Sequence, residues 1–572
     1  MPMKRLLLIL AMALPAADLL AWGAGHDVQV AQTFRKLPVQ IRENISDQNQ
    51  KAMLRWAHFP DGHKKPSSNA AVVKAVGESE AKWLDSFIPS QFVFHSANGK
   101  CAAFMMLAKS FREKRYDAAT FYMGTLMHSI ADPSAFNHGP LTHMLTYFRY
   151  NNAAFPKCNL DLIVYDSSPE IRKRTEELLE GFEPDMSEKK LDDILAELQI
   201  QAWKAAAFMS SIESGLYAPP AAGQTYSKGY VETMAQTANR QIREGVNLVC
   251  AAWAIANSDQ KIDIENSEFT KPAKAKIPRP IAERGEKAIA EFVKAKKLSD
   301  DSIYAGISEG AGPLPAIGVV AEPSMEMGIA KLGFANRLFA ALCARTLKAE
   351  GKSFRLVSLF DIEKSVPNPK EVPILIIPTR AAFPNAKELN KYVENGGKLL
   401  IIGGTNANIA NLGGYFAKRP NNETPVSPAY GTANTEEIKD MKIEFDGPLA
   451  AVAKKKVAPF AANPNTPAGW GKPVANLEIK ILDDKVVPLA WLQYGKHQTK
   501  YCVCAAFKNA GGEIFAIWLP QYLIMPMLFT PEKERMPDWS KPRLDSFAKP
   551  IFLECVKLLE KPQPKGSLGG KN

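Results

Sequence analysis

The stretch LMHSIADPSAFNH, which spans residues 126–138, is the part of the sequence on which our interpretation of the fold depends. It places His128 and Asp132 four residues apart, and His138 follows six residues later. Residues four apart lie on the same face of an α-helix, so His128 and Asp132 can point toward one object. Because zinc accepts imidazole and carboxylate ligands, this spacing predicts a helix that presents two metal ligands side by side.

The chain contains eight histidines, and most of them lie near this stretch. Seven fall within the first 143 residues, namely His26, His58, His63, His95, His128, His138 and His143. The eighth, His497, stands alone. Core histidines would be scattered more evenly over a chain of this length. Since histidine is the commonest metal ligand in proteins, the cluster favours a metal centre in the first half of the chain.

Hydrophobic periodicity indicates helices through most of the first 260 residues. Helices are expected at 26–58, 70–90, 100–113, 116–131, 169–181, 187–215 and 225–256. They predict an all-α domain over residues 22–257. The loop FPDGH at 59–63 interrupts them. Asp61 in this loop is either a functional carboxylate or the acceptor of an Asx-turn.

Length and composition indicate a globular protein with two or three domains. Of the 572 residues, 46% are hydrophobic and 23% are charged. The net charge of +11 favours anionic partners such as phosphate esters, nucleic acid or membrane surfaces, and a solvated basic surface is the alternative. Seven cysteines in so long a chain do not indicate a disulfide framework, although Cys101 and Cys158 could pair in an oxidising compartment.

Residues 1–21 have the features of a secretory signal peptide, with two early basic residues, an apolar run at 6–14 and a small residue at Ala21. The apolar run is too short to span a membrane, and no later stretch is long and apolar enough to do so. We therefore expect a secreted or periplasmic protein that begins at Trp22. The amine and carbonyl of Trp22 could chelate a metal ion, or its indole could be a buried anchor.

From about residue 313 short apolar strands alternate with helices. Strands are expected at 316–320, 354–358, 372–378 and 396–404, with helices at 328–348 and 386–394. This alternation predicts a parallel sheet with helices on both faces. Further strands are expected at 477–482, 500–507 and 513–519, and a closing helix at 544–560. We interpret 258–312 as a linker with one short helix at about 281–297, 313–562 as an α/β domain and 563–572 as a flexible tail.

The first domain resembles the superfamily of zinc-dependent phospholipases C and single-strand-specific zinc nucleases. The resemblance rests on the processed Trp in WGAGH at 22–26, on Asp61 in its Pro-containing loop, on His95, and on the H-x3-D-x5-H spacing that begins at His128. It implies an all-α enzyme that holds up to three zinc ions and cleaves phosphodiester bonds.

The resemblance also implies the ligands of each ion. One zinc would be held by Asp61, His95, His128 and Asp132, and a second by the Trp22 amine and carbonyl, His26 and Asp132. A third would be held by His138, His143 and a carboxylate. The family carries this acid four residues after the second histidine, where this chain has Tyr147, so Asp161 or Asp166 takes its place or the third ion is weak or absent. Asp61 is the candidate catalytic residue that orients or deprotonates the attacking water.

The second domain resembles the class I glutamine amidotransferase-like proteins, which have a flavodoxin-like α/β fold. The resemblance rests on ILIIP at 374–378 and on YVENGGKLLIIGG at 392–404. Catalytic members carry a nucleophilic Cys just after the second strand, where this chain has Gly403-Gly404-Thr405-Asn406. The resemblance therefore implies a non-catalytic domain that binds a ligand or mediates oligomerisation.

Together these features predict an exported, zinc-dependent phosphodiester hydrolase of the phospholipase C type, with contact to a membrane surface. A nuclease for single-stranded nucleic acid is the first alternative. A non-catalytic surface or periplasmic binding protein with a degenerate metal site is the second, because Tyr147 and the absent Cys both depart from catalytic patterns.

Overall fold

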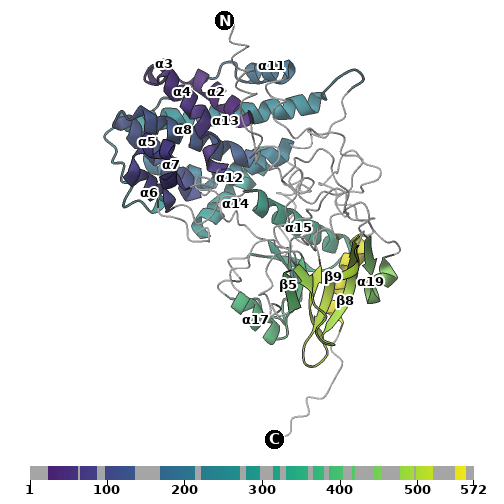
Figure 1. Cartoon of the computed structure of the whole chain (residues 1–572). Helices are drawn as coiled ribbons and strands as arrows, with labels where there is room; N and C mark the ends of the chain where they lie inside the picture. Colours follow the sequence, from purple (N-terminus) through teal and green to yellow (C-terminus); the bar gives the residue numbers. More distant parts are fainter. Residues whose placement is uncertain are drawn as a thin grey trace. The chain divides into compact units, whose positions relative to one another are not determined.

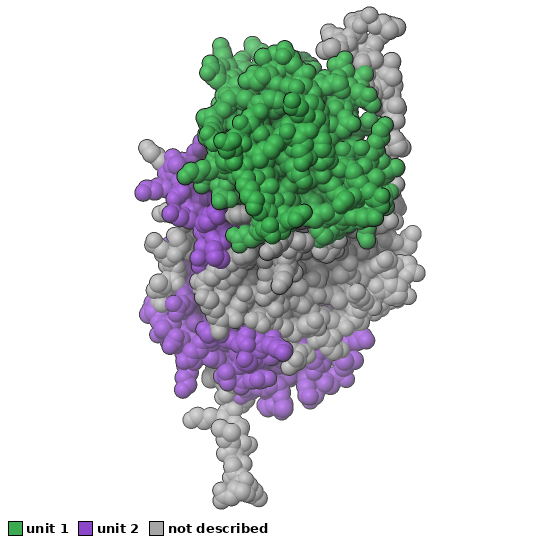
Figure 2. All heavy atoms as spheres, turned by 90° about the vertical axis from the view of Figure 1, so that its left-hand side faces the viewer, with its two compact units in different colours: residues 1–135, 159–195, 235–272 green, residues 136–158, 196–234, 273–572 purple. Residues whose placement is uncertain are grey.

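The computed structural model describes most of both halves of the chain. The described residues are 24–61, 65–86, 97–134, 168–212, 215, 221–270, 279–296, 313–321, 330–358, 362, 365–378, 386–402, 412, 415–418, 442–453, 477–494, 497–519, 523 and 548–561. Within these ranges the side chains of some residues are not described, among them those of 24–28, 61 and 330–339. The chain divides into two compact units, which Figure 2 shows in different colours. The first comprises residues 1–135, 159–195 and 235–272, and the second comprises 136–158, 196–234 and 273–572.

Helices are the only regular elements described between residues 24 and 270, as the periodicity predicts. They are α2 Ala24–Lys36, α3 Val39–Arg42, α4 Asp47–Trp56, α5 Ala70–Val76, α6 Glu78–Asp85, α7 Ala97–Arg112, α8 Tyr116–Ala131, α11 Pro169–Leu178, α12 Leu191–Ile212 and α13 Lys228–Ala256. Single 3-10 turns are found at η1 Phe59–Asp61, η2 Pro66–Ser68, η3 Asp132–Ser134 and η6 Glu268–Thr270. The expectation of helical structure in this part is therefore confirmed for the described residues.

Two of the expected helices are broken into shorter ones. The range 26–58 contains three helices, because Pro38 lacks an N–H group and Ser46 starts a new helix by accepting a hydrogen bond from the Asn49 N–H at 3.2 Å. The range 70–90 contains two helices, which Gly77 separates with its positive φ of 94°. These breaks let short helices pack around a common centre.

Helix α8 is that centre in the first unit. Every residue from Ala118 to Ala131 is buried, in keeping with the nearly continuous apolar sequence of the helix. Both α4 and α7 pack against α8, and Figure 1 shows the three together. Gly124 permits the close approach of α4, because a Cβ atom at Gly124 would lie 2.6 Å from the Met53 carbonyl oxygen and 2.8 Å from the Trp56 Cβ.

The segment that the sequence suggests as a linker contains α14, Arg279–Ala295, close to the expected helix at 281–297. This helix packs on α12, since Gly285 lies against the Trp203 indole. The Arg284 guanidinium also donates to the Ala196 carbonyl oxygen. The buried Trp203 thus gives α14 a tertiary contact of its own.

The second unit contains an eight-stranded mixed sheet with the order β2-β1-β3-β4-β10-β9-β8-β6. Its strands are β1 Ile317–Ala321, β2 Phe354–Ser358, β3 Ile374–Ile377, β4 Lys398–Ile402, β6 Lys442–Phe445, β8 Val486–Tyr494, β9 His497–Lys508 and β10 Ile514–Leu519. The five strands from β2 to β10 are parallel, as expected for the first four. The pairs β10–β9, β9–β8 and β8–β6 are antiparallel, so the sheet as a whole is mixed. Separately, β5 Phe416–Lys418 pairs with β7 Leu477–Ile479.

Strand β8 is a long strand that the sequence analysis did not find. Pro488 interrupts its β-pattern, and proline is usually excluded from strands inside a sheet. In the structure Pro488 lies where the register between β8 and β9 shifts, so the missing N–H removes no regular ladder bond. The shift in register therefore explains how β8 can contain Pro488 although it pairs with both β6 and β9.

Helices cover both faces of the sheet, as predicted. On one face Leu389 and Tyr392 of α17, Ala386–Glu394, join an apolar cluster that includes Leu399 and Trp518. Helix α21, Ala548–Glu560, packs against β4 and β10 without joining that cluster, so it covers the other face. Helix α15, Ala330–Ala349, packs on β1 and β2, and the short α19, Gly447–Val452, on β8. Within the described ranges, no helix has the length and apolarity that crossing a membrane requires.

Candidate metal centre

The predicted zinc ligands fall into three groups in the structure. Trp22, His95, His138 and His143 lie outside the described residues, as do Tyr147, Asp161 and Asp166. The backbone of His26 lies in α2 and that of Asp61 in η1, but neither side chain is described. His128 and Asp132 are fully described, and they are the residues from which the site can be built.

His128 is completely buried in the last turn of α8. Its Nδ1 lies 2.6 Å from the carbonyl oxygen of Ala57, the residue that ends α4. A carbonyl oxygen can only accept, so Nδ1 carries the proton and donates it. In this tautomer of the neutral ring the lone pair lies on Nε2, and histidine binds a metal in that form. The close α4–α8 approach at Gly124, one turn earlier, brings Ala57 within reach.

Asp132 follows one turn after His128 and begins η3. Its exposed fraction is 9%, and α13 fixes the backbone around it. The amide Nε2 of Gln241 donates to the Ala131 carbonyl oxygen and to Ser134 Oγ, both at 3.1 Å. Ser134 Oγ in turn donates to the Ala131 carbonyl oxygen at 3.0 Å. Gln241, itself 1% exposed, thus holds the turn on both sides of Asp132.

A buried lysine provides positive charge near Asp132. Lys100 of α7 is 1% exposed, and burial lowers its pKa from 10.5 to about 8. Glu244 of α13 and then Asp132 oppose this lowering because their negative charges favour the ammonium form. Glu244 also lies 3.7 Å from the guanidinium of Arg240. Charges of both signs are therefore gathered inside the first unit around the end of α8.

Several buried oxygen atoms near the C-terminal end of α8 have no hydrogen-bond partner among the described residues. They are Oε1 of Gln29, Oγ1 of Thr33 and Oε1 of Gln241. Gln29 lies near the end of α8, because its Nε2 contacts the Met127 carbonyl oxygen at 3.5 Å. Buried oxygens are normally satisfied, so these acceptors fit a bound cation or ordered water. The chemistry of the surroundings is thus compatible with the predicted metal.

The described side chains alone do not complete a metal site. Among them, no group of three or more His, Cys, Asp or Glu residues is arranged to hold an ion. Of the eight predicted ligands, only His128 and Asp132 have described side chains. The finding therefore applies to these two residues alone.

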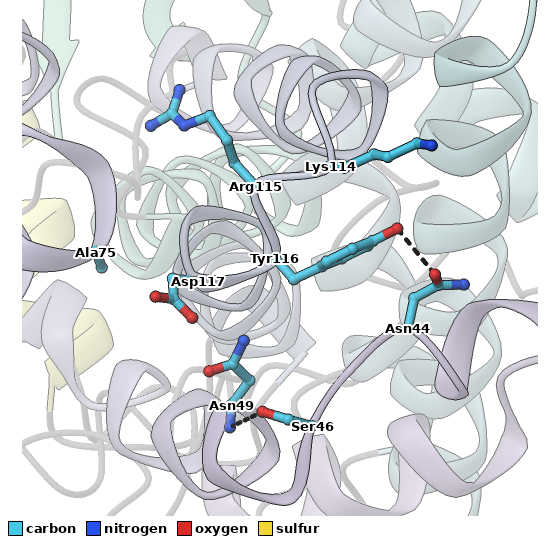
Figure 3. A pocket seen from close by; sticks show the side chains of 8 residues that line it. All are labelled: Asn44, Ser46, Asn49, Ala75, Lys114, Arg115, Tyr116 and Asp117. Carbon is cyan, nitrogen blue, oxygen red and sulfur yellow. Dashed lines mark hydrogen bonds between the residues drawn. The ribbon is translucent and has the colours of Figure 1, made fainter.

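A separate polar pocket lies at the other end of α8 (Figure 3). It has a volume of about 440 Å³ and is lined by Asn44, Ser46, Asn49, Ala75, Lys114, Arg115, Tyr116 and Asp117. The Tyr116 hydroxyl donates to Asn44 Oδ1 at 2.9 Å. Asp117 precedes His128 by eleven helical residues, or about 16 Å at 1.5 Å per residue, so this pocket is not part of the candidate centre.

Sequence reasoning missed Lys100, Gln241 and Glu244. Lys100 does leave a signal, because it is a single charge in the otherwise apolar run that opens α7. Gln241 and Glu244 are three residues apart in a long amphipathic helix, where polar residues at this spacing usually mark the solvated face.

Comparison with known proteins supplies no relative for this chain. No family model matches it, and neither a curated protein nor a solved structure does. The function is therefore inferred from the residues of the site.

Proposed function

We propose that this protein is an exported, zinc-dependent phosphodiester hydrolase of the phospholipase C type. The observation that supports the proposal best is the hydrogen bond from His128 Nδ1 to the Ala57 carbonyl oxygen. Metal-binding histidines commonly donate their second ring N–H to a backbone carbonyl, which sets the tautomer and the ring orientation. Asp132 follows on the same helical face, and Gln241 holds its backbone in place.

The residues of this chain have distinct roles in the proposal. Zinc ions would be held by Trp22, His26, Asp61, His95, His128, Asp132, His138 and His143. Bound zinc lowers the pKa of water to near 7 and neutralises charge on phosphoryl oxygens. Asp61 orients the attacking water or accepts its proton. The Ala57 carbonyl and the Gln241 amide keep His128 and Asp132 in the geometry that binding requires.

We also propose a particular fold for each half of the chain, beyond its general fold class. We assign residues 22–257 to an all-α fold of the zinc phospholipase C and nuclease type, and 313–562 to a glutamine amidotransferase-like domain. The parallel strand order β2-β1-β3-β4-β10 supports the second assignment, because it matches the 2-1-3-4-5 order of flavodoxin-like sheets. Without a Cys after β4, this domain would bind a ligand or mediate oligomerisation.

One observation favours a second function, that of a non-catalytic surface or periplasmic binding protein. The ammonium of Lys100 lies close enough to Asp132 to interact with its charge. A buried lysine can neutralise a carboxylate that would otherwise need a metal ion. In that case the metal site would be incomplete and structural, with one zinc ion or none.

Zinc stoichiometry on protein with a verified Trp22 start separates the two functions. We expect two or three zinc ions in the wild type and a loss of zinc in His128→Gln. His497→Gln, which changes the one histidine outside the cluster, is the matched control and should keep its zinc. A wild-type protein that binds one zinc ion or none would contradict the hydrolase and favour the binding protein.

Activity assays then separate the two enzyme classes. Hydrolysis of a chromogenic phosphodiester would establish the reaction class. Phosphatidylcholine vesicles and single-stranded DNA would follow, and the His128→Gln protein serves as the blank for each. Turnover of the vesicles but not of the DNA is expected for a phospholipase C, whereas the reverse preference would indicate the nuclease.

A further inference from the structure

The polar pocket at the start of α8 takes no part in the candidate metal centre. It lies where the first turn of α8 meets the first turn of α4 and the end of α5 (Figure 3). Its volume of about 440 Å³ is within the range of small-molecule sites, roughly 300–1,000 Å³. Every lining residue except Ala75 is polar. A molecule that fills this pocket must therefore be polar itself.

Hydrogen bonds to another helix fix the Tyr116 ring in the wall of the pocket. The Tyr116 hydroxyl donates to Asn44 Oδ1 at 2.9 Å, and the Asn44 amide donates to the Gln40 carbonyl oxygen at 2.7 Å. Asn44 thus uses both ends of its amide within the protein. Because the ring is held in advance, a ligand that packs on it does not have to order it.

Arg115, which precedes α8, belongs to the same wall. Its guanidinium donates to the Val76 carbonyl oxygen at 2.7 Å and forms ion pairs with Glu80 at 3.0 Å and Glu113 at 3.2 Å. The positive charge of Arg115 is therefore balanced by carboxylates of the protein, and its donors are engaged by the wall.

Three other lining groups have no partner among the described residues. They are the amide of Asn49, the carboxylate of Asp117 and the ammonium of Lys114. In Figure 3 Asn49 of α4 and Asp117 of α8 point toward each other, yet no hydrogen bond joins them. Ser46 Oγ accepts from the Asn49 backbone N–H at 3.2 Å and keeps its own proton to donate. Free donors and free acceptors therefore face the same space.

The charges and the mixed lining indicate the class of ligand. With Arg115 balanced, Lys114 and Asp117 contribute one charge of each sign, so the pocket favours neither a phosphate ion nor a metal cation. Hydroxyl groups match the lining, because each hydroxyl both donates and accepts. A pyranose sugar carries several hydroxyls on one ring, and its C–H groups offer an apolar surface to an aromatic side chain such as that of Tyr116.

We propose that this pocket is a binding site for a pyranose sugar. The Asn49 amide and the Asp117 carboxylate hold hydroxyls of one sugar ring, and the Tyr116 ring packs against its C–H groups. The site recognises the ring alone, so a free glycan and the headgroup of a glycolipid share the required chemistry. The inference goes beyond the proposed function and does not depend on zinc.

Saturation-transfer NMR on the full chain tests the proposal. The probes are the methyl glycosides of glucose, galactose, mannose and N-acetylglucosamine, with inorganic phosphate and glycine as charged comparisons. We expect saturable binding of at least one glycoside. Binding of none of them, or of phosphate or glycine alone, would overturn the proposal. Co-sedimentation with phosphatidylcholine vesicles, with and without a glycolipid that carries the bound sugar, then separates a membrane source from a free glycan.

Two substitutions on α4 show whether the bound glycoside occupies this pocket. Asn49→Ala removes an amide that has no partner in the protein, and alanine favours the helix, so the fold should be at least as stable. We expect its affinity for the glycoside to fall at least about 10-fold, the loss of one charged or well-placed hydrogen bond. Gln48→Ala, at an exposed neighbour that does not line the pocket, is the matched control and should bind as the wild type does.

Asp117→Asn, which keeps the size of the side chain and removes its charge, should also weaken binding at least about 10-fold. His128→Gln should bind the glycoside as the wild type does, because the metal centre lies at the other end of α8. Zinc content is measured on the same samples, so a failure of the proposed function is seen separately. Unchanged glycoside affinity in Asn49→Ala and Asp117→Asn would overturn this inference, whether or not the protein holds zinc.

Discussion

His128 Nδ1 donates a hydrogen bond of 2.6 Å to the carbonyl oxygen of Ala57, 71 residues earlier in the chain. The two ring nitrogens of His128 therefore have different roles, which two substitutions separate. In His128→Asn the side-chain amide can still donate to Ala57, but the nitrogen equivalent to Nε2 is lost. We expect zinc affinity to fall at least about 100-fold with little loss of stability in chelator.

In His128→Leu both nitrogens are lost, and the Ala57 carbonyl has no donor. We expect the free energy of unfolding in chelator to fall by about 1–3 kcal/mol, together with the loss of zinc. Urea unfolding and competition with a zinc indicator measure the two effects. An Asn variant that binds zinc as the wild type does would show that Nε2 is not a ligand.

Gln241 should affect zinc binding without contacting the ion. Gln241→Glu keeps the size of the side chain but replaces the donor of the bonds to Ala131 and Ser134 with an acceptor. We expect a 10- to 100-fold loss of zinc affinity, roughly the effect of removing an outer-shell partner. Gln199→Glu, at another buried glutamine, is the matched control and should leave zinc affinity unchanged. Equal affinities in all three proteins would contradict the positioning role.

Gly124 of α8 and Gly245 of α13 form a graded pair of tests for helix packing in the first unit. A Cβ at Gly124 would meet the Met53 backbone at 2.6 Å, whereas one at Gly245 would meet the Thr33 methyl at 3.0 Å. We expect Gly124→Ala to destabilise the protein by about 2–3 kcal/mol and Gly245→Ala by about 1 kcal/mol or less, because a backbone cannot move aside as a side chain can. Urea unfolding measures both, and the reverse order would contradict the helix packing described.

The Tyr122 hydroxyl joins α8 to α6 through a charged partner. It donates to Glu80 Oε1 at 2.6 Å, and Glu80 also pairs with the Arg115 guanidinium at 3.0 Å. Tyr122→Phe should lower the free energy of unfolding by about 1–3 kcal/mol, since it removes a partly buried bond to a carboxylate. Tyr116→Phe, which removes only an exposed bond to Asn44, should cost less and serves as the control. Equal losses would show that burial adds nothing to the Tyr122 bond.

Because Lys100 is buried, we expect the free energy of unfolding of the metal-free protein to rise at alkaline pH. Burial lowers its pKa to about 8 in the folded state, whereas the unfolded chain keeps a value near 10.5. Between these values the unfolded state binds more protons, so the free energy of unfolding increases with pH, by about 3 kcal/mol in total. Below pH 8 this contribution is constant and unfavourable.

The effect of Lys100 is measured as the difference in the free energy of unfolding between the wild type and Lys100→Met. Other groups titrate in both proteins and cancel in that difference. We expect the stability of Lys100→Met relative to the wild type to fall as pH rises from 8 to 10. A difference that stays constant over this range would show that Lys100 is not a buried cation.

The local patterns of the sequence determined much of the architecture. The helix predicted at 116–131 and the observed α8 coincide, because its apolar residues and its C-terminal Pro133 act over short distances. The first four strands of the parallel sheet were also predicted, since buried strands are short, apolar runs bounded by turns. The spacing of His128 and Asp132 on one helical face follows from the helical repeat alone.

The tertiary structure decided what surrounds those residues. Gln241 reaches Ala131 across 110 residues of sequence, and Lys100 approaches Asp132 from another helix, so no local pattern contains either contact. The same holds for β8, whose Pro488 is tolerated only because its pairing with β9 shifts there. Periodicity reports which face of an element is apolar, but the partner that covers this face is chosen by packing among elements distant in the chain.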